Sequence, residues 1–189
     1  MDISLWDERY RTGAHAASDF NTEPSPLLAS AASKLPLGRA LDLAAGAGRN
    51  GLWLAERGWQ VTAVDGSSAA VEILRTRATE RHLAINTFVA DLEKHEFPIA
   101  PSAWDLVAMC YYLQRDLFEP AKSGVVPGGV IVAIVHITEP GEEPTGHRLR
   151  PGELAGYFCD WGVLHYREGT PNDPVHKRAC AEIVARRPR

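Results

Sequence analysis

The chain has 189 residues, of which 45% are hydrophobic and 23% are charged, values close to those of ordinary globular domains. This length suits one well-buried domain rather than two, so we expect a single domain over residues 1–189. Lys and Arg number 20 against 24 Asp and Glu, which gives a net charge of −4 with neutral histidines. Such a charge provides no broad attraction for nucleic acid or anionic lipid, and we expect neither as a partner.

The sequence predicts neither membrane insertion nor secretion. Its longest uninterrupted apolar run, Val130–Val135, is far shorter than the roughly 20 residues of a membrane span and predicts a buried strand. The stretch Met1–Ser4 is acidic where a secretory signal is basic, so we expect a cytoplasmic protein. Cys110, Cys159 and Cys180 are widely spaced, which predicts reduced thiols and no metal site.

Two short helices are expected before the first strand. Leu5–Arg11 and Leu27–Lys34 carry helical patterns, and the stretch Phe20–Pro26 between them is rich in turn residues. Residues 1–34 are too few for a separate domain. We therefore expect them to pack on the rest of the chain as a helical lid or cover.

From residue 35 onward the sequence alternates strands and helices. Five apolar runs predict strands at Ala40–Leu43, Gln60–Val64, Ile85–Ala90, Asp105–Met109 and Val130–Ile137. Between them we expect a helix over Asn50–Arg57 that Gly58 ends, a longer helix capped by Ser67, and a helix over Arg115–Ser123 before a turn at Pro127–Gly129. Strands that are apolar throughout are typical of parallel sheets covered on both faces.

The last third of the chain has a different pattern. It predicts a helix over Pro151–Phe158 and then two strands, Gly162–Tyr166 and Ala179–Ala185, separated by a polar loop. Such an ending is typical of a hairpin. The whole pattern predicts an α/β fold, with a doubly wound, mainly parallel sheet over residues 35–189.

The most informative stretch follows the first strand. Gly46-x-Gly48-x-x-Gly51 matches the dinucleotide fingerprint, with Asp65 at about the right distance to hold a ribose. Asp42 argues against a dinucleotide, because a carboxylate at the mouth of the strand would repel a pyrophosphate. It favours a cationic ligand such as S-adenosylmethionine, which carries an ammonium and a sulfonium group. An NAD-dependent oxidoreductase and a non-catalytic adenosyl-ligand-binding protein are the alternatives.

Acidic residues at three successive strand ends strengthen the prediction of S-adenosylmethionine. Gly46 and Gly48 would let the backbone approach the cofactor, Asp65 could accept hydrogen bonds from both ribose hydroxyls, and Asp91 suits the adenine amine. About half of single strand-end aspartates are loop or helix-cap residues. The prediction therefore depends on the combination of the three acidic residues with the glycines after the first strand.

The core resembles the class I, Rossmann-like S-adenosylmethionine-dependent methyltransferases over nearly the whole chain. Further motifs resemble the small tellurite-resistance and thiopurine-methyltransferase-like enzymes: Trp6–Tyr10, Glu23–Pro26, Gly48–Asn50, Arg150–Leu154 and Trp161. The resemblance implies a seven-stranded sheet of order 3-2-1-4-5-7-6. Ala44 stands where the loop of this family has its first glycine, a departure of one methyl group.

The resemblance also implies which residues bind the cofactor, with S-adenosylhomocysteine as the product. It places Asp42, Gly46 and Gly48 at the methionine end, Asp65 and Gly66 at the ribose, and Asp91 and Leu92 at the adenine. The full set of expected cofactor-binding residues is Arg9, Asp42, Ala44, Gly46, Gly48, Asn50, Asp65, Gly66, Ser67, Asp91, Leu92 and Cys110.

The side that would receive the methyl group is less defined, and no catalytic residue is assigned. The candidates are Tyr10, Tyr111, Arg148, His176 and Arg178. Tyr10 belongs either to a lid or to a helix that seals the sheet, and Tyr111 either borders the acceptor or shields the sheet edge. Arg148, His176 and Arg178 either attract an anionic acceptor or are solvated charges.

Methyl transfer is an in-line displacement, to which positioning alone can contribute on the order of 7–11 kcal/mol. A thiolate, selenide or telluride needs little or no general base, whereas an oxygen or nitrogen acceptor needs one. The segment Cys110–Leu113 stands where amino-methylating enzymes have Asn/Asp-Pro-Pro-Tyr/Phe. We therefore expect a small-molecule acceptor, such as a thiol, selenite or tellurite, and a monomer or homodimer.

Overall fold

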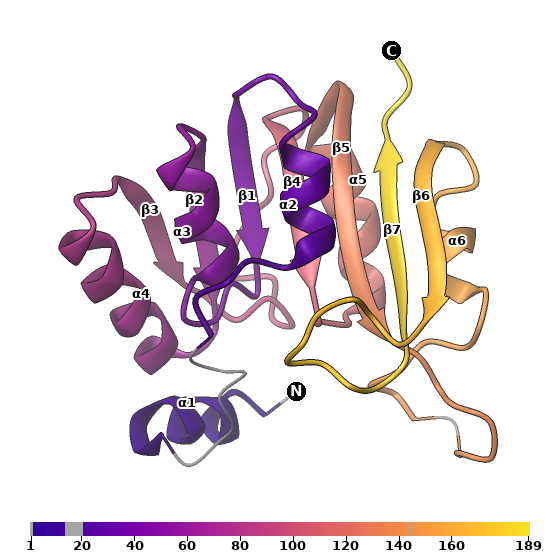
Figure 1. Ribbon diagram of the computed structural model, residues 1–189, viewed down its shortest axis with the longest axis horizontal. Coiled ribbons are helices and arrows are strands. Elements are labelled where there is room, and N and C mark those ends of the chain that lie inside the picture. Colours follow the sequence, from indigo (N-terminus) through magenta and orange to yellow (C-terminus); the bar gives the residue numbers. More distant parts are fainter. Residues whose placement is uncertain (1, 14–20, 144) are drawn as a thin grey trace.

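A computed structural model describes residues 2–13, 21–143 and 145–189. Its strands form one sheet in the order β3-β2-β1-β4-β5-β7-β6 (Figure 1). They are β1 (Arg39–Leu43), β2 (Gln60–Asp65), β3 (Ile85–Val89), β4 (Trp104–Cys110), β5 (Val125–His136), β6 (Gly162–Gly169) and β7 (Cys180–Arg186). Strands β1 to β5 are parallel, and β7 is antiparallel to both β5 and β6. The predicted fold class and strand order are confirmed.

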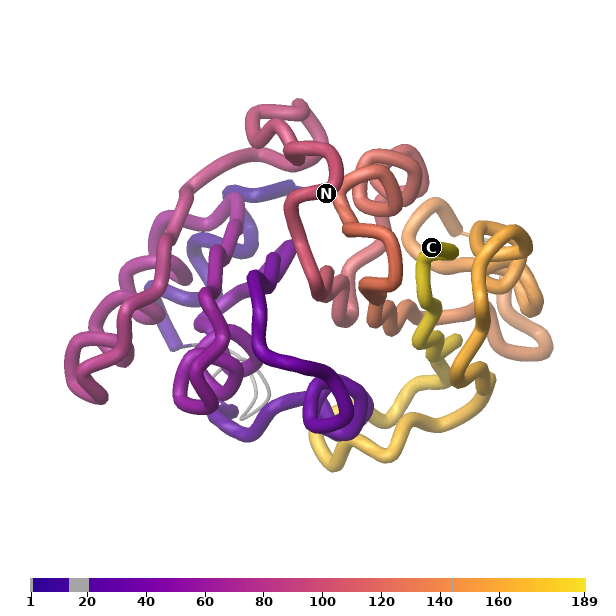
Figure 2. Tube along the Cα trace, turned by 90° about the horizontal axis from the view of Figure 1, so that it is seen from above, coloured from indigo at the N-terminus to yellow at the C-terminus, as the bar shows by residue number. Residues whose placement is uncertain are grey.

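Helices cover both faces of the sheet (Figure 2). They are α1 (Ile3–Thr12), α2 (Pro26–Ala32), α3 (Arg49–Glu56), α4 (Ser68–Glu80), α5 (Phe118–Gly124) and α6 (Glu153–Gly156), with a short 3₁₀ turn η1 (Arg115–Leu117) before α5. Neighbouring residues of a strand enter different cores. In β4, Leu106 packs with α2 and α3, while Val107 packs with α5 and α6. This alternation explains why the central strands are apolar throughout.

Most helix and strand ends differ from the sequence predictions by one to three residues, and three elements differ in form or extent. Strand β5 begins at Val125 and contains the predicted turn, because its pairing with β4 jumps from Val125 to Val130 and residues 126–129 bulge out of register. The predicted helix over residues 115–123 is divided into η1 and α5, with Pro120 in the first turn of α5, where a proline is tolerated. Helix α6 covers only residues 153–156 and starts after Gly152, whose φ is +81°.

The N-terminal segment contains the two expected helices, α1 and α2. Residues 21–25 between them form neither helix nor strand, and Phe20, the start of the predicted turn-rich stretch, lies outside the described residues. Helix α1 lies beneath the carboxyl ends of β1, β2 and β3 (Figure 1). Since ligands of open α/β sheets bind at this edge, the position of α1 is relevant to function.

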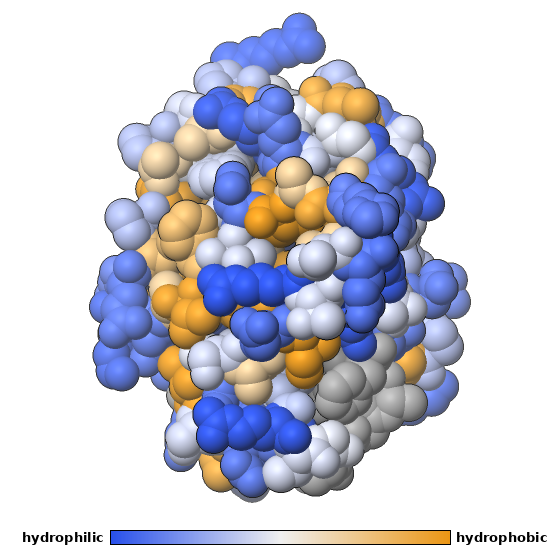
Figure 3. Space-filling model, turned by 90° about the vertical axis from the view of Figure 1, so that its left-hand side faces the viewer, coloured by the Kyte–Doolittle hydropathy of each residue, from blue (hydrophilic) through white to orange (hydrophobic). Residues whose placement is uncertain are grey.

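The side of the molecule next to β3 and α4 shows apolar patches between charged side chains (Figure 3). Phe88 and Val89 of β3 are 46% and 48% exposed. Across residues 2–13, 21–143 and 145–189, none of the helices combines the length and the hydropathy of a membrane-spanning segment.

Candidate active site

A cavity of about 180 Å³ lies between the carboxyl ends of the first four strands and α1. Strand order reverses here between β1 and β4, which is where open α/β sheets bind ligands. The predicted site residues in its wall are Tyr10, Ala44, Gly46, Asn50, Asp65, Gly66, Ser67, Asp91, Leu92, Cys110, Tyr111 and His176. The predicted site residues outside its wall are Arg9, Asp42, Gly48, Arg148 and Arg178.

The loop after β1 depends on left-handed backbone. Ala44, Gly46 and Gly48 have φ values of +54°, +54° and +86°. A Cβ on Gly46 would lie 2.6 Å from the hydroxyl oxygen of Tyr10, so this glycine keeps open the space between loop and lid. A Cβ on Gly48 would instead lie 2.5 Å from Cγ of Leu74 in α4. The structure thus gives Gly48 a packing role, and its part in cofactor binding stays a prediction.

Asp65 ends β2 and faces the cavity. Its Oδ2 accepts a hydrogen bond from the backbone N–H of Gly46 and its Oδ1 accepts one from that of Ser67, both at 2.8 Å. Burial raises the pKa of Asp65, while the two N–H donors act to lower it. Each oxygen keeps further acceptor capacity. The carboxylate is therefore fixed in place and can accept hydrogen bonds from two neighbouring hydroxyls of a ligand.

Asp42 lies in β1 behind the loop and is 1% exposed. Burial raises its pKa to about 7, against the lowering effects of the Gly51 backbone hydrogen bond and the Arg49 charge. Its Oδ2 is buried and has no hydrogen-bond partner among the residues that the structure describes. The carboxyl group therefore does not reach the cavity wall directly, and its predicted contact with the amino group of the cofactor stays a prediction.

The pH dependence of stability should report the burial of Asp42. Because the folded-state pKa is about 7 and the ordinary value is 3.8, the folded protein binds more protons between these values. The contribution of Asp42 to stability therefore falls as pH rises from about 4 to 7, by at most about 1.4 kcal/mol per pH unit. Urea unfolding of Asp42→Asn should show a flatter pH dependence than the wild type in this window. Parallel profiles for the two proteins would contradict this environment.

Asp91 follows β3 and has a structural role in addition to facing the cavity. Its Oδ1 accepts hydrogen bonds from the N–H groups of Glu93 and Lys94 at 3.0 and 3.3 Å, and its Oδ2 pairs with Nζ of Lys94 at 3.0 Å. Leu92 beside it is 5% exposed and belongs to the core. Asp91 thus shapes the turn that borders the cavity, and its contact with adenine stays a prediction.

Asn50 and Cys110 form the inner wall. Asn50 is 5% exposed, and its Oδ1 accepts a hydrogen bond from the backbone N–H of Ser25 at 2.9 Å. Burial and the nearby charge of Asp42 raise the pKa of the Cys110 thiol. Cys110 therefore remains a neutral thiol and is unsuited to act as a nucleophile.

Helix α1 covers the cavity, and none of its residues is fully buried. Oδ1 of Asp7 accepts hydrogen bonds from Oγ of Ser67 at 2.8 Å, Oγ of Ser68 at 3.1 Å and the N–H of Ala69 at 2.9 Å. This carboxylate sits at the N-terminus of α4, where a negative charge is favourable. A cavity of about 180 Å³ is small beside the roughly 300–1,000 Å³ of ligand pockets. Whether α1 acts as a movable lid or as a permanent seal stays a prediction.

Removal of the Asp7 carboxylate should release α1. An isolated helix of ten residues is marginal in water, so undocked α1 should unfold. We expect Asp7→Ala to raise amide hydrogen exchange in residues 3–12 about tenfold or more, the equivalent of one or more charge-assisted hydrogen bonds. Glu8→Ala is the matched control, because Glu8 is exposed on the same helix. Equal exchange in the two variants would show that Asp7 does not hold the lid.

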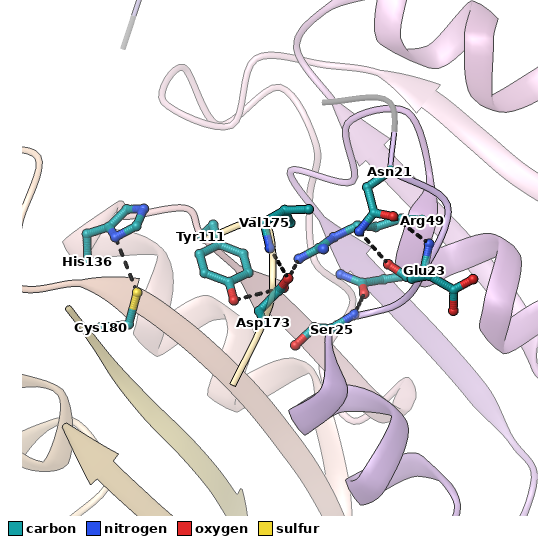
Figure 4. A network of polar contacts seen from close by, with 10 residues as sticks. Asn21, Glu23, Ser25, Arg49, Tyr111, His136, Asp173, Val175 and Cys180 are labelled. Atoms are coloured by element: carbon teal, nitrogen blue, oxygen red, sulfur yellow. Dashed lines mark hydrogen bonds and ion pairs between the residues drawn. The ribbon is translucent and has the colours of Figure 1, made fainter. Parts of the chain in front are cut away.

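Tyr111 and His176 form an aromatic part of the cavity wall. Their rings are stacked with centroids 3.4 Å apart and planes 8° apart. Tyr111 has a φ of +62°, and its hydroxyl donates a hydrogen bond to Oδ2 of Asp173 at 3.0 Å (Figure 4). Burial and the charge of Asp173 raise the pKa of Tyr111, so the phenol stays protonated. The wall is aromatic, and strain in the Tyr111 backbone is typical of a functional position.

Two arginines predicted for the acceptor side come together away from the cavity. Arg148 and Arg178 both pair with the carboxylate of Glu142. Their charges lower the pKa of the half-buried His136, although burial is the larger cause. Because Glu142 pairs with both guanidinium groups, an anionic acceptor in the cavity would gain little from them.

Sequence reasoning missed Arg49 and Asp173. Nη2 of Arg49 lies 2.7 Å from Oδ2 of Asp173, and the two side chains are 12% and 2% exposed. Arg49 was visible within the Gly48–Asn50 motif, but its partner lies 124 positions later in a polar loop. No local pattern singles out Asp173. Within the described parts of the chain, no three His, Cys, Asp or Glu side chains are grouped closely enough to hold a metal ion.

The fold and the cavity define a class of protein. The strand order, the glycine loop after β1 and the acidic residue at the end of β2 are those implied by the resemblance to methyltransferases. A family model described as a methyltransferase domain matches residues 40–129. In fold and in the matched domain the chain is similar to the class I, S-adenosylmethionine-dependent methyltransferases.

Within this class the chain is similar to TehB. A probable S-adenosyl-L-methionine-dependent methyltransferase TehB of Haemophilus influenzae is 27% identical over 143 residues, covering 69% of this chain and 48% of that protein. Its crystal structure matches with a TM-score of 0.73 and 24% identity, covering 85% of this chain and 61% of the other. Hemagglutinin 1 of Eikenella corrodens is also 27% identical over 143 residues, or 69% of this chain and 46% of that protein. The chain spans about half the length of these two relatives.

A second solved structure matches along the whole chain. It concerns the conversion of a disulfide bond into a thioacetal group during echinomycin biosynthesis, and it covers 100% of this chain and 93% of the other. The TM-score is 0.72 and the sequence identity is 19%, so the likeness shows the shared fold.

Proposed function

We propose that this chain transfers the methyl group of S-adenosylmethionine to a small-molecule acceptor bound in the same cavity. The observation that carries the proposal is Asp65, held between the N–H groups of Gly46 and Ser67 at the cavity wall. The buried acid Asp42 lies close enough to Asp65 for the charge of Asp65 to raise its pKa. Two neighbouring acids favour a cationic cofactor over the pyrophosphate of NAD.

The residues of the cavity fit this cofactor. The loop at Gly46 would border the methionine end, Asp65 and Gly66 the ribose, and Asp91 and Leu92 the adenine. When bound, the sulfonium supplies a methyl carbon that accepts an electron pair from the acceptor while the electrons of the broken bond return to sulfur. The task of the chain is to orient and enclose both molecules, which α1 does from one side and the Tyr111–His176 wall from the other.

The acceptor in this proposal is a soft nucleophile, with a thiol or selenol favoured over an oxyanion. The aromatic wall favours an acceptor with polarizable atoms, while Arg148 and Arg178 are paired outside the cavity. A soft nucleophile also needs little help from a base. The echinomycin structure concerns a disulfide bond and a thioacetal group, both of which contain sulfur. The motifs that resemble tellurite-resistance methyltransferases keep selenite and tellurite among the compounds to test.

Calorimetry and a transfer assay test the proposal in sequence. S-adenosylhomocysteine should bind with one site per chain and NADH should not. Radiolabelled S-adenosylmethionine should then methylate members of a panel of aromatic thiols, aliphatic thiols, selenite, tellurite, phenols and amines, with thiols methylated fastest. NADH binding without S-adenosylhomocysteine binding would overturn the class of cofactor. Binding without methylation of any compound would favour a non-catalytic adenosyl-ligand-binding protein, and preference for an amine would overturn the soft-nucleophile proposal.

A further inference from the structure

One buried carboxylate joins three segments that are distant in sequence. Oδ2 of Asp173, in the loop between β6 and β7, lies 2.7 Å from Nη2 of Arg49 and accepts a hydrogen bond from the hydroxyl of Tyr111 at 3.0 Å. Its Oδ1 accepts a hydrogen bond from the N–H of Val175 at 3.3 Å. Figure 4 shows Arg49 and Tyr111 converging on Asp173 from different elements. The group thus connects the start of α3, the end of β4 and the β6–β7 loop.

Both side chains of the ion pair are nearly excluded from water. Although burial alone would raise the pKa of Asp173, the hydrogen bond and charge of Arg49 hold it below its usual value. Asp173 raises the pKa of Arg49 in turn, against the effect of burial. An ion pair in such surroundings is costly to separate, since either partner alone would be a buried, uncompensated charge. The two segments it joins should therefore move together.

The two segments that this connection joins both contribute to the cavity wall, one through Arg49 and the other through His176. Arg49 follows the glycine loop, whose Ala44–Ala47 segment would border the cofactor. Three residues beyond Asp173, His176 stacks on Tyr111, and these two rings form what we call the acceptor wall. The guanidinium carbon of Arg49 also lies 5.3 Å from the centroid of the Tyr111 ring. The pair Arg49–Asp173 therefore connects the residue after the glycine loop with the segment that carries His176.

We propose that Asp173 is a positioning residue. It acts through Arg49 and Tyr111 so that the Tyr111–His176 wall becomes ordered when the glycine loop binds the cofactor. This inference rests on the proposed function and adds to it an order of binding, in which the cofactor precedes the acceptor. Filling the cofactor end of the cavity restrains the glycine loop and Arg49, and the restrained Arg49 fixes Asp173 and the β6–β7 loop. By thermodynamic linkage, an ordered acceptor wall in turn favours the bound cofactor.

Hydrogen exchange of the full chain, with S-adenosylhomocysteine as the probe, tests this inference. In the wild type, the probe should slow exchange in residues 170–178. In Asp173→Asn, exchange without the probe should be about tenfold faster in this segment, and the additional protection that the probe confers should fall by about tenfold. Equal protection of residues 170–178 by the probe in both proteins would overturn the inference. A purely structural role would accelerate exchange without changing the effect of the probe.

Two further variants complete the test. Glu182→Gln is the matched control, because Glu182 pairs with Arg167 within the β6–β7 hairpin and outside the cavity wall. It should leave the effect of the probe on residues 170–178 unchanged. If Asp173→Asn does not fold, Tyr111→Phe removes one hydrogen bond to Asp173 and should reduce the effect of the probe in the same direction. An unchanged effect in Tyr111→Phe would then overturn the inference.

Failure of the inference is distinguishable from failure of the proposed function. If S-adenosylhomocysteine does not bind the wild type in calorimetry, the proposed function fails, and the inference fails with it because the cofactor has no effect to transmit. If the probe binds and protects residues 3–12 and 44–47 but not residues 170–178, the proposed function stands. In that case only the inference about Asp173 is overturned.

Discussion

Asp65→Ala is expected to weaken binding of S-adenosylhomocysteine by about 10- to 150-fold, the equivalent of roughly 1.5–3 kcal/mol for charge-assisted hydrogen bonds. The reason is geometric. The N–H groups of Gly46 and Ser67 fix the carboxylate at the cavity wall, so its remaining lone pairs are already oriented when the ligand arrives. Calorimetric titration at a temperature where the variant is folded measures this loss directly.

The substitution also removes the acceptor for two backbone N–H groups, so a control must separate affinity from stability. Asp105→Ala is suited to this purpose. Asp105 accepts a hydrogen bond from the backbone N–H of Arg39 at 2.8 Å, but it lies near the amino end of β4, away from the cavity. Both variants should lose stability, and only Asp65→Ala should lose affinity. Equal affinity in Asp65→Ala and the wild type would show that the ribose lies elsewhere.

The order of the strands could be predicted because two kinds of information agreed. Apolar runs such as Val130–Val135 indicate strands buried on both faces, and the motif after β1 points to a family with a known strand order. Element ends were harder to place. The bulge at residues 126–129 depends on the pairing of Trp104 with Val125, a contact between segments about 20 residues apart. Local turn signals cannot distinguish such a bulge from a turn.

The cofactor side of the cavity was accessible to sequence reasoning because parallel strands bring their carboxyl ends to one edge. Asp65 ends β2 and Asp91 follows β3, so their closeness in space could be predicted from their places in the chain. Burial of Asp42 could not be predicted in the same way. Whether a carboxyl at the end of a strand faces the ligand or lies beneath the loop depends on how that loop packs.

The acceptor side shows more clearly what could not be predicted from the sequence. Arg148 and Arg178 were grouped with His176 because all three lie in the C-terminal loops, but the fold directs both arginines to Glu142 and only His176 to the cavity. Charged residues in loops pair through tertiary contacts, and no spacing in the sequence predicts which residues will pair. The pairing of Arg49 with Asp173 depends on the same kind of contact.

Gly48→Ala is expected to lower the free energy of unfolding by about 2–4 kcal/mol. Two costs combine, the left-handed φ of +86° and the clash of the new Cβ, 2.5 Å from Cγ of the buried Leu74. A left-handed residue with a Cβ costs roughly 1–2 kcal/mol, and overpacking costs roughly 1–3 kcal/mol. The lower entropy of the unfolded alanine chain offsets roughly 0.4–1 kcal/mol of this. Urea unfolding of the two proteins measures the difference.

Gly152→Ala separates the two costs. Gly152 precedes α6 as Gly48 precedes α3, with a similar φ of +81°, but a Cβ there would meet no atom within 4 Å. It should therefore lose only about 0.5–1 kcal/mol, the backbone cost less the gain from the unfolded chain. The difference between the variants measures how tightly the glycine loop packs on α4. If both variants lose the same stability, Leu74 moves aside freely and the loop is not held by α4. If Gly48→Ala loses more, as expected, this packing is what fixes the loop that borders the cofactor end of the cavity.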